Sequence, residues 1–106
     1  MKTGAQLIAR ERTRGINVEG WTAKHDDIHR NGELALAANC YAEMAYYQIG
    51  TSFERASHMA SRAWPFEMSW WKPCIDPQDN LIKAGALIAA EIDRLNRAKA
   101  KKARLS

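Results

Sequence analysis

The stretch DPQDNLIKAGALIAAEIDRL, residues 76–95, carries the clearest helix signal in the chain. Asp76 is a preferred N-cap residue, Pro77 suits the first helical position because its missing N–H costs no bond there, and Asp79 is favoured by the helix dipole. These signals predict a helix of about five or six turns that begins at residue 77. Its expected buried residues recur at three- and four-residue spacing: Leu81, Ala84, Gly85, Ile88, Ile92 and Leu95. Gly85 lowers helix stability by up to ~1 kcal/mol relative to Ala, a loss that close contact with another helix often offsets.

Two further main helices are predicted ahead of this stretch. Thr3 and Gln6 have the spacing of a capping box, which predicts a helix over residues 4 to about 14, ending at Gly15 or continuing to residue 16. A second helix is predicted over residues 32–48, with an apolar stripe at helical spacing: Leu34, Ala37, Ala38, Tyr41, Ala42 and Ala45.

The remaining segments are predicted as loops and one short helix. Residues 18–30 lose the helical periodicity and form an expected loop, while residues 52–62 suit a short helix with Ala56, Met59 and Ala60 turned inward. Residues 64–73 are rich in Trp and Pro, which favours an ordered, packed loop. The predicted fold class is therefore all-α, a small bundle of three main helices with a long ordered Trp/Pro-rich loop. Residues 1–98 form the expected single domain, and residues 99–106 form a basic C-terminal tail.

Charge and composition narrow the functional classes. The chain has 106 residues and a formal net charge of +4, and its last eight residues hold four cationic side chains: Lys99, Lys101, Lys102 and Arg104. Without this tail the charge is balanced, so DNA binding is the least supported function. No apolar run is long enough to span a membrane, and residues 1–14 lack the apolar core of a secretory signal. We therefore expect a soluble protein of the cytoplasm. We also expect a homo-oligomer, because a short chain buries a small share of its own surface.

Two isolated cysteines, Cys40 and Cys74, give neither a disulfide framework nor a zinc signature. The segment WTAKHDDIH, residues 21–29, instead gathers two imidazoles and two carboxylates, and Glu33 follows at the start of a helix. One interpretation is structural, with the carboxylates of Asp26 and Asp27 capping a turn. The alternatives are a site for Mg²⁺, Mn²⁺ or Zn²⁺, for which Asp, Glu and His are suitable ligands, and a polar pocket for a small molecule.

Four tryptophans are an excess in so short a chain. They either complete a sparse core or present stacking surfaces. The adjacent rings of Trp70 and Trp71 are expected to point in different directions, which leaves at least one of them as a stacking candidate. Lys72 follows the pair directly, and Arg12 adds positive charge on the first helix. Aromatic rings beside cations, with hydroxyl and carboxylate groups nearby, favour a nucleotide as ligand.

Motifs spread over nearly the whole chain resemble a family of small proteins from tailed phages and prophages. The matching residues are Ala9 to Arg12, Glu19 to Thr22, His25 to Asp27, Gly32 to Ala35, Trp70 to Pro73, and Leu81 to Ala84 continuing through Ala90 to Arg94. This resemblance implies a phage protein in the host cytoplasm, without implying a reaction. Gly20-Trp21-Thr22, Asp26-Asp27 and Asp79-Asn80 are also similar to ryanodine-receptor repeat domains, which implies recognition of nucleotide-derived signals. The helix start at Gly32 to Ala35 resembles all-α nucleoside triphosphate pyrophosphatases of the MazG type, which implies Mg²⁺-dependent hydrolysis.

From these observations we favour binding over catalysis: we expect a phage-encoded protein that binds a nucleotide-type ligand and sequesters it as a host anti-phage defence signal. No catalytic residue, metal or cofactor is assigned in this interpretation. The expected ligand-binding residues lie in two segments and the first helix: Arg12, Trp21, Thr22, His25, Asp26, Asp27, His29, Glu33, Trp70, Trp71 and Lys72. Trp21 and Trp71 are expected to stack, Lys72 and Arg12 to meet phosphate, and the three carboxylates to accept hydrogen bonds.

Two other functions remain open at this stage. One is a nucleotide pyrophosphatase that uses Mg²⁺ or Mn²⁺ held by Asp26, Asp27, Glu33 and Glu91. The other is an inhibitor that docks on a host or defence protein through exposed Trp and Arg side chains, the residue types that dominate interface hot spots.

Overall fold

The computed structural model describes residues 1–105, and in this part of the chain all regular structure is helical. The elements follow in the order α1 (Gly4–Glu19), α2 (Ala23–Asp26), α3 (Glu33–Tyr47), α4 (Phe53–Ala60), η1 (Ser61–Ala63), η2 (Met68–Trp70) and α5 (Pro77–Leu105), the two η elements being single 3₁₀ turns. The prediction of an all-α fold is confirmed. Over the described residues, no helix is both long and apolar enough to cross a membrane.

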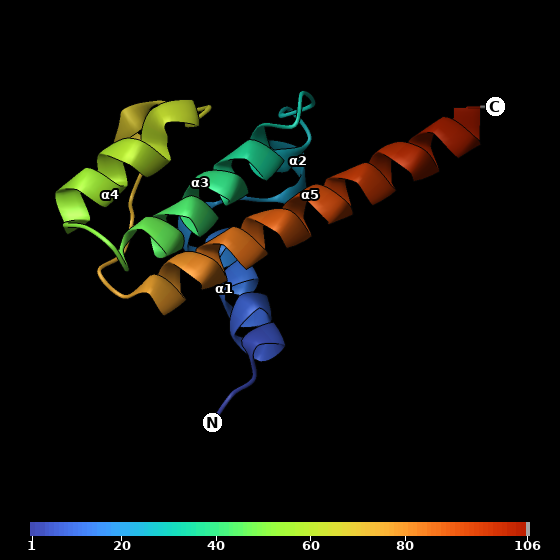
Figure 1. Cartoon of the computed structure of the whole chain (residues 1–106). Helices are drawn as coiled ribbons and strands as arrows, with labels where there is room; N and C mark the ends of the chain where they lie inside the picture. The colour runs from blue at the N-terminus through green and yellow to red at the C-terminus, as the bar shows by residue number, and fades with distance from the viewer. Residues whose placement is uncertain (106) are drawn as a thin grey trace.

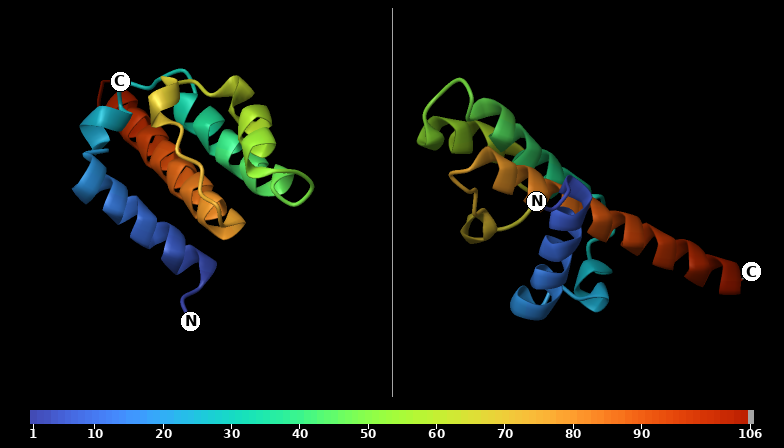
Figure 2. Two further views of the ribbon diagram at one scale, coloured as in Figure 1. Left: turned by 90° about the vertical axis from the view of Figure 1, so that its left-hand side faces the viewer. Right: turned by 90° about the horizontal axis from the view of Figure 1, so that it is seen from below.

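Helices α1, α3 and α5 form the main bundle. Helix α3 packs along α5 in the opposite direction, and α1 packs on another side of α5, so that α5 lies between them (Figures 1 and 2). Helix α4 and η1 cover α3 and make no close packing with α1. The C-terminal end of α5 stands clear of the other helices (Figure 1).

Helix α1 starts as predicted and ends later than predicted. Thr3 and Gln6 form both bonds of the capping box. The helix continues past Gly15 to Glu19 and ends at Gly20, whose φ of 74° lies in the left-handed region that glycine adopts without strain. Gly15 is buried because the ring of Trp21 lies against it, and a Cβ at this position would come within 3.3 Å of that ring.

The segment at residues 18–30, which was predicted as a loop, contains one helical turn, α2.

The core is built largely from small residues of α3 and α4. Leu34, Ala37, Ala38, Tyr41 and Ala45 are buried as predicted, whereas Ala42 is exposed and Cys40 and Met44 take the interior positions. From α4, Ala56 and Ala60 pack against Met44, which confirms two of the three residues predicted to face inward, whereas Met59 is only partly buried. Small side chains let the helix backbones approach closely, so the bundle has a thin but dense interior.

Helix α5 buries a different face from the predicted one. Leu81, Ile88, Ile92 and Leu95 are 53, 51, 54 and 44% exposed, while its buried side chains are Asn80, Ala84, Ala86, Ala90, Glu91 and Arg94. The prediction was right for Ala84 and wrong for these four large residues, because α5 has two faces with helical periodicity and the Ala-rich face allows closer helix packing. At Gly85 the expected close contact is present, since Ile8 of α1 occupies the space where a Cβ would lie.

Helix α5 is also longer than predicted, since it continues to Leu105 as one helix of 29 residues. The basic segment expected as a tail from residue 99 is therefore helical as far as residue 105. Its side chains are exposed, so positive charge gathers at the end of α5, where the helix dipole favours cations.

A network of polar side chains fixes the segment that joins η2 to α5. Asn80 is fully buried, its amide nitrogen donates to the side chain of Gln48 and to the carbonyl of Cys74, and its oxygen accepts the Cys74 N–H, all at 2.8 Å. At Lys72, two residues before Cys74, the backbone N–H donates to the Tyr41 hydroxyl at 3.2 Å. The backbone carbonyl of Lys72 accepts a hydrogen bond from the Lys83 ammonium at 2.8 Å. The backbone around Lys72 is thereby held against α3 and α5.

Candidate functional site

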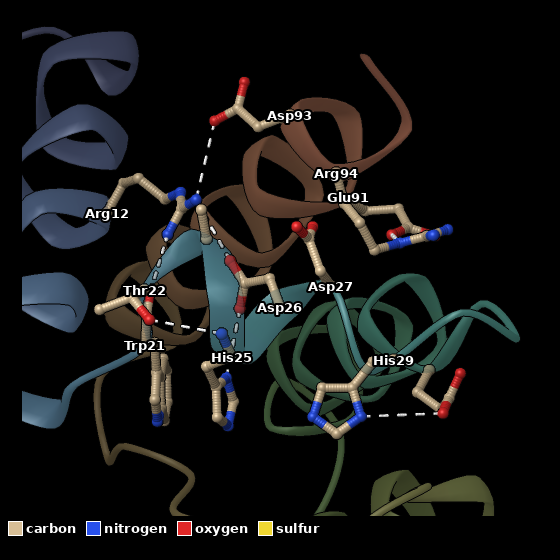
Figure 3. A network of polar contacts seen from close by, with 12 residues as sticks. Arg12, Trp21, Thr22, His25, Asp26, Asp27, His29, Glu91, Asp93 and Arg94 are labelled. Atoms are coloured by element: carbon tan, nitrogen blue, oxygen red, sulfur yellow. Dashed lines mark hydrogen bonds and ion pairs between the residues drawn. The ribbon is translucent and has the colours of Figure 1, made fainter. Parts of the chain in front are cut away.

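The acidic turn at α2 is held by an arginine from α1. Arg12 bonds through Nη2 to a carboxylate oxygen of Asp26 at 3.3 Å and through Nη1 to the carbonyl of Trp21 at 3.4 Å (Figure 3). Asp26 is only 2% exposed, so its carboxylate depends on Arg12 and on the His25 imidazole, whose Nδ1 lies 3.4 Å from its other oxygen. Arg12 also lies 3.7 Å from Asp93 of α5, and it therefore joins α1, α2 and α5.

Local sequence explains why the turn forms. The hydroxyl of Thr22 accepts the N–H of His25 at 3.3 Å and caps α2, a helical turn in a segment that was predicted to be a loop. This single turn directs Asp26 toward Arg12 (Figure 3). It leaves Asp27 on the outside, where its carboxylate binds Arg97 of α5 at 2.7 Å.

A cavity of about 490 Å³ lies between α1, the α2 turn, the segment from Trp64 to Lys72 and α5. Seven of the eleven predicted ligand-binding residues line it: Arg12, Trp21, His25, Asp26, His29, Trp70 and Lys72. The acidic turn and the Trp-rich segment are 40 to 50 residues apart in sequence, and the fold brings them to the same cavity. Thr22, Asp27, Glu33 and Trp71 are not among the lining residues.

Two tryptophan rings face each other at the cavity. The rings of Trp21 and Trp70 are nearly parallel, at an interplanar angle of 26°, and their centroids are 6.5 Å apart. This distance is near the upper end of the range for direct aromatic contact. Trp70 lies at the end of the single turn η2 and is 48% exposed, whereas Trp21 is held between Gly15 and the Arg12 network.

The adjacent tryptophans Trp70 and Trp71 point in different directions, as the sequence indicated. Trp71 packs against the core residues of α3 and α4, and its indole N–H donates to the Ser57 hydroxyl at 2.8 Å. Its ring also lies 4.7 Å from the centroid of Tyr41. The stacking role expected for Trp71 therefore does not fit its position, and Trp70 is the member of the pair on the cavity.

Further aromatic residues complete the wall. Phe66 lies edge-on to His29 with centroids 4.9 Å apart, and Trp64 meets Tyr41 in the same manner at 5.6 Å. Burial raises the pKa of Tyr41 to about 12, so its hydroxyl stays protonated at neutral pH. The sequence did not identify Tyr41 and Phe66 as site residues, because Tyr41 fits the core stripe of α3 and Phe66 has no motif of its own.

The charges around the cavity balance. The basic side chains are Arg12, Arg14, Lys72 and Lys83, and the acidic ones are Glu11, Glu19, Asp26 and Glu67. Four positive and four negative groups leave no net charge.

Most of these charges are paired within the chain. Arg14 lies between Glu11 at 2.7 Å and Glu19 at 3.6 Å, and hydrogen bonding to Glu11 raises the pKa of its guanidinium further above its usual value. Among the described residues, the ammonium of Lys72 and the carboxylate of Glu67 have no ion-pair or hydrogen-bond partner.

The carboxylates suggested as metal ligands lie apart and are engaged elsewhere. The Arg97 hydrogen bond lowers the pKa of Asp27, and backbone N–H groups, first its own and then that of Asn31, lower the pKa of Glu33. Glu91 forms a largely buried ion pair with Arg94 at 2.6 Å. Over residues 1–105, no three His, Cys, Asp or Glu side chains are arranged to hold a metal ion.

Two polar nitrogen atoms at the cavity have no hydrogen-bond partner within the described residues. These are Nε of Arg12 and Nε1 of Trp21, both inaccessible to solvent.

Comparison with protein-family models, curated proteins and solved structures finds no match to this chain. The chemistry of the cavity therefore carries the functional argument.

Proposed function

We propose that the protein binds a small nucleotide-type ligand in the cavity and withholds it without converting it. The observation that carries this proposal is the pair of nearly parallel indoles, Trp21 and Trp70, at a cavity of about 490 Å³. That volume lies within the usual range of about 300–1,000 Å³ for small-molecule sites, which are also mostly apolar with a few polar groups.

A flat ring enters between the two indoles only if Trp70 moves outward. A ring with a van der Waals gap of about 3.5 Å on each side requires planes about 7 Å apart. The centroids of Trp21 and Trp70 are 6.5 Å apart, which sets an upper limit on the spacing of the ring planes. Trp70 is half exposed on a short turn, which leaves room for its ring to move outward and admit a purine or pyrimidine base. Stacking on an aromatic side chain contributes about 1–3 kcal/mol per base.

The charged groups fit a ligand with few phosphates. Lys72 presents an unpaired ammonium, while the Lys83 ammonium is bonded to a backbone carbonyl and lies 5.4 Å from the Tyr41 ring centroid. Both arginines of the lining are already paired with carboxylates. Because the lining has no net charge, it favours a nucleoside monophosphate or a cyclic nucleotide over a triphosphate, whose charge would stay largely uncompensated.

Acceptors for the base or the ribose are also present. Glu67, whose carboxylate is unpaired, lines the cavity together with Trp64, whose indole N–H donates to the Glu67 carbonyl at 3.0 Å. A carboxylate accepts hydrogen bonds from ribose hydroxyls or from the amino and imino groups of a base. The imidazoles of His25 and His29, whose centroids are 5.1 Å apart, add groups that donate or accept.

The biological part of the proposal rests on the resemblance to phage proteins. A phage protein that binds a nucleotide tightly and does not degrade it acts as a sponge, lowering the free concentration of a host defence signal. Binding is favoured over turnover because Asp26, Asp27 and Glu91 are each neutralised by an arginine, and a metal would have to displace these partners.

Isothermal titration calorimetry with a panel of nucleoside monophosphates and cyclic mono- and dinucleotides tests the proposal. We expect at least one of them to bind, and Trp70→Ala and Lys72→Ala each to weaken it about tenfold or more. The matched controls are Tyr46→Ala and Lys24→Ala, which remove an exposed ring and an exposed ammonium away from the cavity lining. Equal affinity in Trp70→Ala would contradict the stacking arrangement.

Two further measurements separate the alternatives. Release of pyrophosphate from nucleoside triphosphates with Mg²⁺ or Mn²⁺, lost in Glu33→Ala, would replace binding with catalysis. Mass spectrometry of the protein purified from infected cells should show a retained nucleotide. A stoichiometric host protein with no small molecule would instead support the inhibitor alternative.

A further inference from the structure

Two histidines on the cavity each turn one ring nitrogen toward a carboxylate. Nδ1 of His25 lies 3.4 Å from an oxygen of Asp26, and Nδ1 of His29 lies 3.7 Å from an oxygen of Glu33 (Figure 3). A carboxylate at Nδ1 holds the proton of a neutral imidazole on that nitrogen, which leaves the lone pair on Nε2. Among the described residues, neither Nε2 has a hydrogen-bond or ion-pair partner.

The fold holds the two imidazoles close together at the cavity that both of them line. Their ring centroids are 5.1 Å apart at an interplanar angle of 70°, and Phe66 packs edge-on against His29. Asp26, which faces His25, is buried and bonded to Arg12. The side chains of His25 and His29 are 34 and 18% exposed, so a small solute in the cavity can reach both rings.

The charges around the two imidazoles make the binding of an anion depend on their protonation. The charged side chains of the lining come from α1, α2, α5 and the segment 64–72, and they balance: Glu11, Arg12, Arg14, Glu19, Asp26, Glu67, Lys72 and Lys83. Tyr41 of α3 adds a neutral hydroxyl, while Glu33 behind His29 and Asp93 beside Arg12 add two carboxylates. An anion is therefore not attracted while both imidazoles are neutral. Each proton added at Nε2 supplies a positive charge and a hydrogen-bond donor.

We propose that His25 and His29 form the subsite for the phosphate of the ligand, and that the phosphate binds there together with protons taken from the solvent. The identity of the ligand rests on the proposed nucleotide site. Two imidazolium Nε2–H groups are charge-assisted donors to phosphate oxygens, and the carboxylates of Asp26 and Glu33 stabilise the imidazolium charges from the Nδ1 side. Because histidine changes charge between about pH 5 and 8, affinity for the ligand rises as the pH falls through this range.

Sulfate tests this subsite without a nucleotide, because its charge stays constant over the pH range in which imidazoles titrate. A site that requires one imidazolium gains up to about 25-fold in affinity from about pH 8 to about pH 6. We expect the dissociation constant for sulfate to fall at least about tenfold over this interval. Histidine ¹H–¹³C NMR signals measure it, and sulfate should move the signals of His25 and His29 and leave that of His58 in place. Sulfate binding that is absent at pH ~6, or equally tight at both pH values, would overturn the proposal.

Variants separate the imidazoles from the other cations of the cavity. His25→Gln and His29→Gln remove the charge and keep an amide donor, so each should abolish most of the pH dependence of sulfate binding. The matched control is His58→Gln, because His58 is exposed on α4 and is not part of the cavity lining. Lys72→Ala should weaken sulfate binding equally at both pH values and leave their ratio unchanged. A pH dependence that survives in both His25→Gln and His29→Gln would overturn the proposal.

Calorimetry with the tightest-binding nucleotide of the panel distinguishes this inference from the proposed function. Titrations at neutral pH in two buffers of different ionisation enthalpy give the number of protons taken up on binding. We expect an uptake of about half a proton or more, which His58→Gln retains and His25→Gln reduces. A nucleotide that binds without this uptake would overturn the inference and leave the nucleotide site intact. Sulfate binding with the expected pH dependence, in a protein that binds no nucleotide, would support the anion subsite and overturn the proposed function.

Discussion

Replacing Arg12 with Met should destabilise the fold strongly because it leaves the buried carboxylate of Asp26 without its guanidinium, with the His25 imidazole at 3.4 Å as its remaining side-chain partner. Asp26 is 2% exposed, and the Arg12 side chain that pairs with it at 3.3 Å is itself 16% exposed. Removing one partner of a buried pair costs about 3–5 kcal/mol. Because Arg12 retains some solvent contact and the pair distance is moderate, we expect the lower end, about 3 kcal/mol. Met keeps most of the aliphatic volume, so the loss reports the charge and its bonds.

Urea unfolding of four chains measures this effect as a double-mutant cycle. The chains are the wild type, Arg12→Met, Asp26→Asn and the double variant, and the coupling energy between the two sites should exceed about 1 kcal/mol. The matched control is Arg14→Met, which removes an arginine that is 41% exposed and paired with Glu11 and Glu19. This control should cost less than about 1 kcal/mol. Equal losses in Arg12→Met and Arg14→Met, or additive losses in the cycle, would refute the reasoning.

Three other consequences follow from single contacts. Gly85→Ala should lower the melting temperature despite the better helix propensity of Ala. The new Cβ would lie 2.6 Å from Cγ1 of Ile8, and such overpacking costs about 1–3 kcal/mol. Adding Ile8→Ala should restore the melting temperature, because it removes the clashing side chain. Burial raises the pKa of Tyr41 to about 12, so ultraviolet absorbance should show one of the three tyrosines ionising near pH 12. The contribution of the protonated Tyr41 hydroxyl to stability is complete below pH ~10 and is lost as the pH rises through 12. Asp27→Asn should lower stability only slightly at pH 7, because the Asp27 carboxylate is exposed. The Arg97 hydrogen bond lowers the pKa of Asp27, so the difference between the two proteins should fade as the pH falls below ~3.8 through the lowered pKa.

The helix starts could be predicted because their signals are local. Thr3 with Gln6, and Asp76 with Pro77, need only their own backbone neighbours to start a helix, and both helices begin where expected. Helix ends depended on contacts outside the local segment. Gly15 stays helical because the ring of Trp21 packs on it, a contact that no spacing rule contains.

The buried face of α5 could not be read from periodicity alone. The Leu and Ile residues and the Ala residues of this helix both recur at helical spacing, and the partner helices select the face that fits them most closely. Buried polar residues were missed for a related reason. Asn80 is buried because Gln48 and the Cys74 backbone satisfy its amide, and Glu91 is buried because Arg94 neutralises it.

The cavity was partly foreseen from residue chemistry. The density of His and Asp near Trp21, and the cation next to paired tryptophans, marked the two segments that the fold brings together. The individual roles depended on side-chain direction. Trp71 turns inward because Ser57 accepts its N–H, and Trp70 is left beside Trp21.

The most direct test of the proposed site is a two-dimensional ¹H–¹⁵N spectrum of the indole N–H groups during titration with the nucleotide that binds most tightly. The chain has four tryptophans, so four signals are expected, and single Trp→Phe variants assign them. The proposal predicts large shifts for Trp21 and Trp70 and a nearly constant signal for Trp71, whose N–H is held by Ser57. Constant signals from Trp21 and Trp70 at saturation would contradict the proposed site.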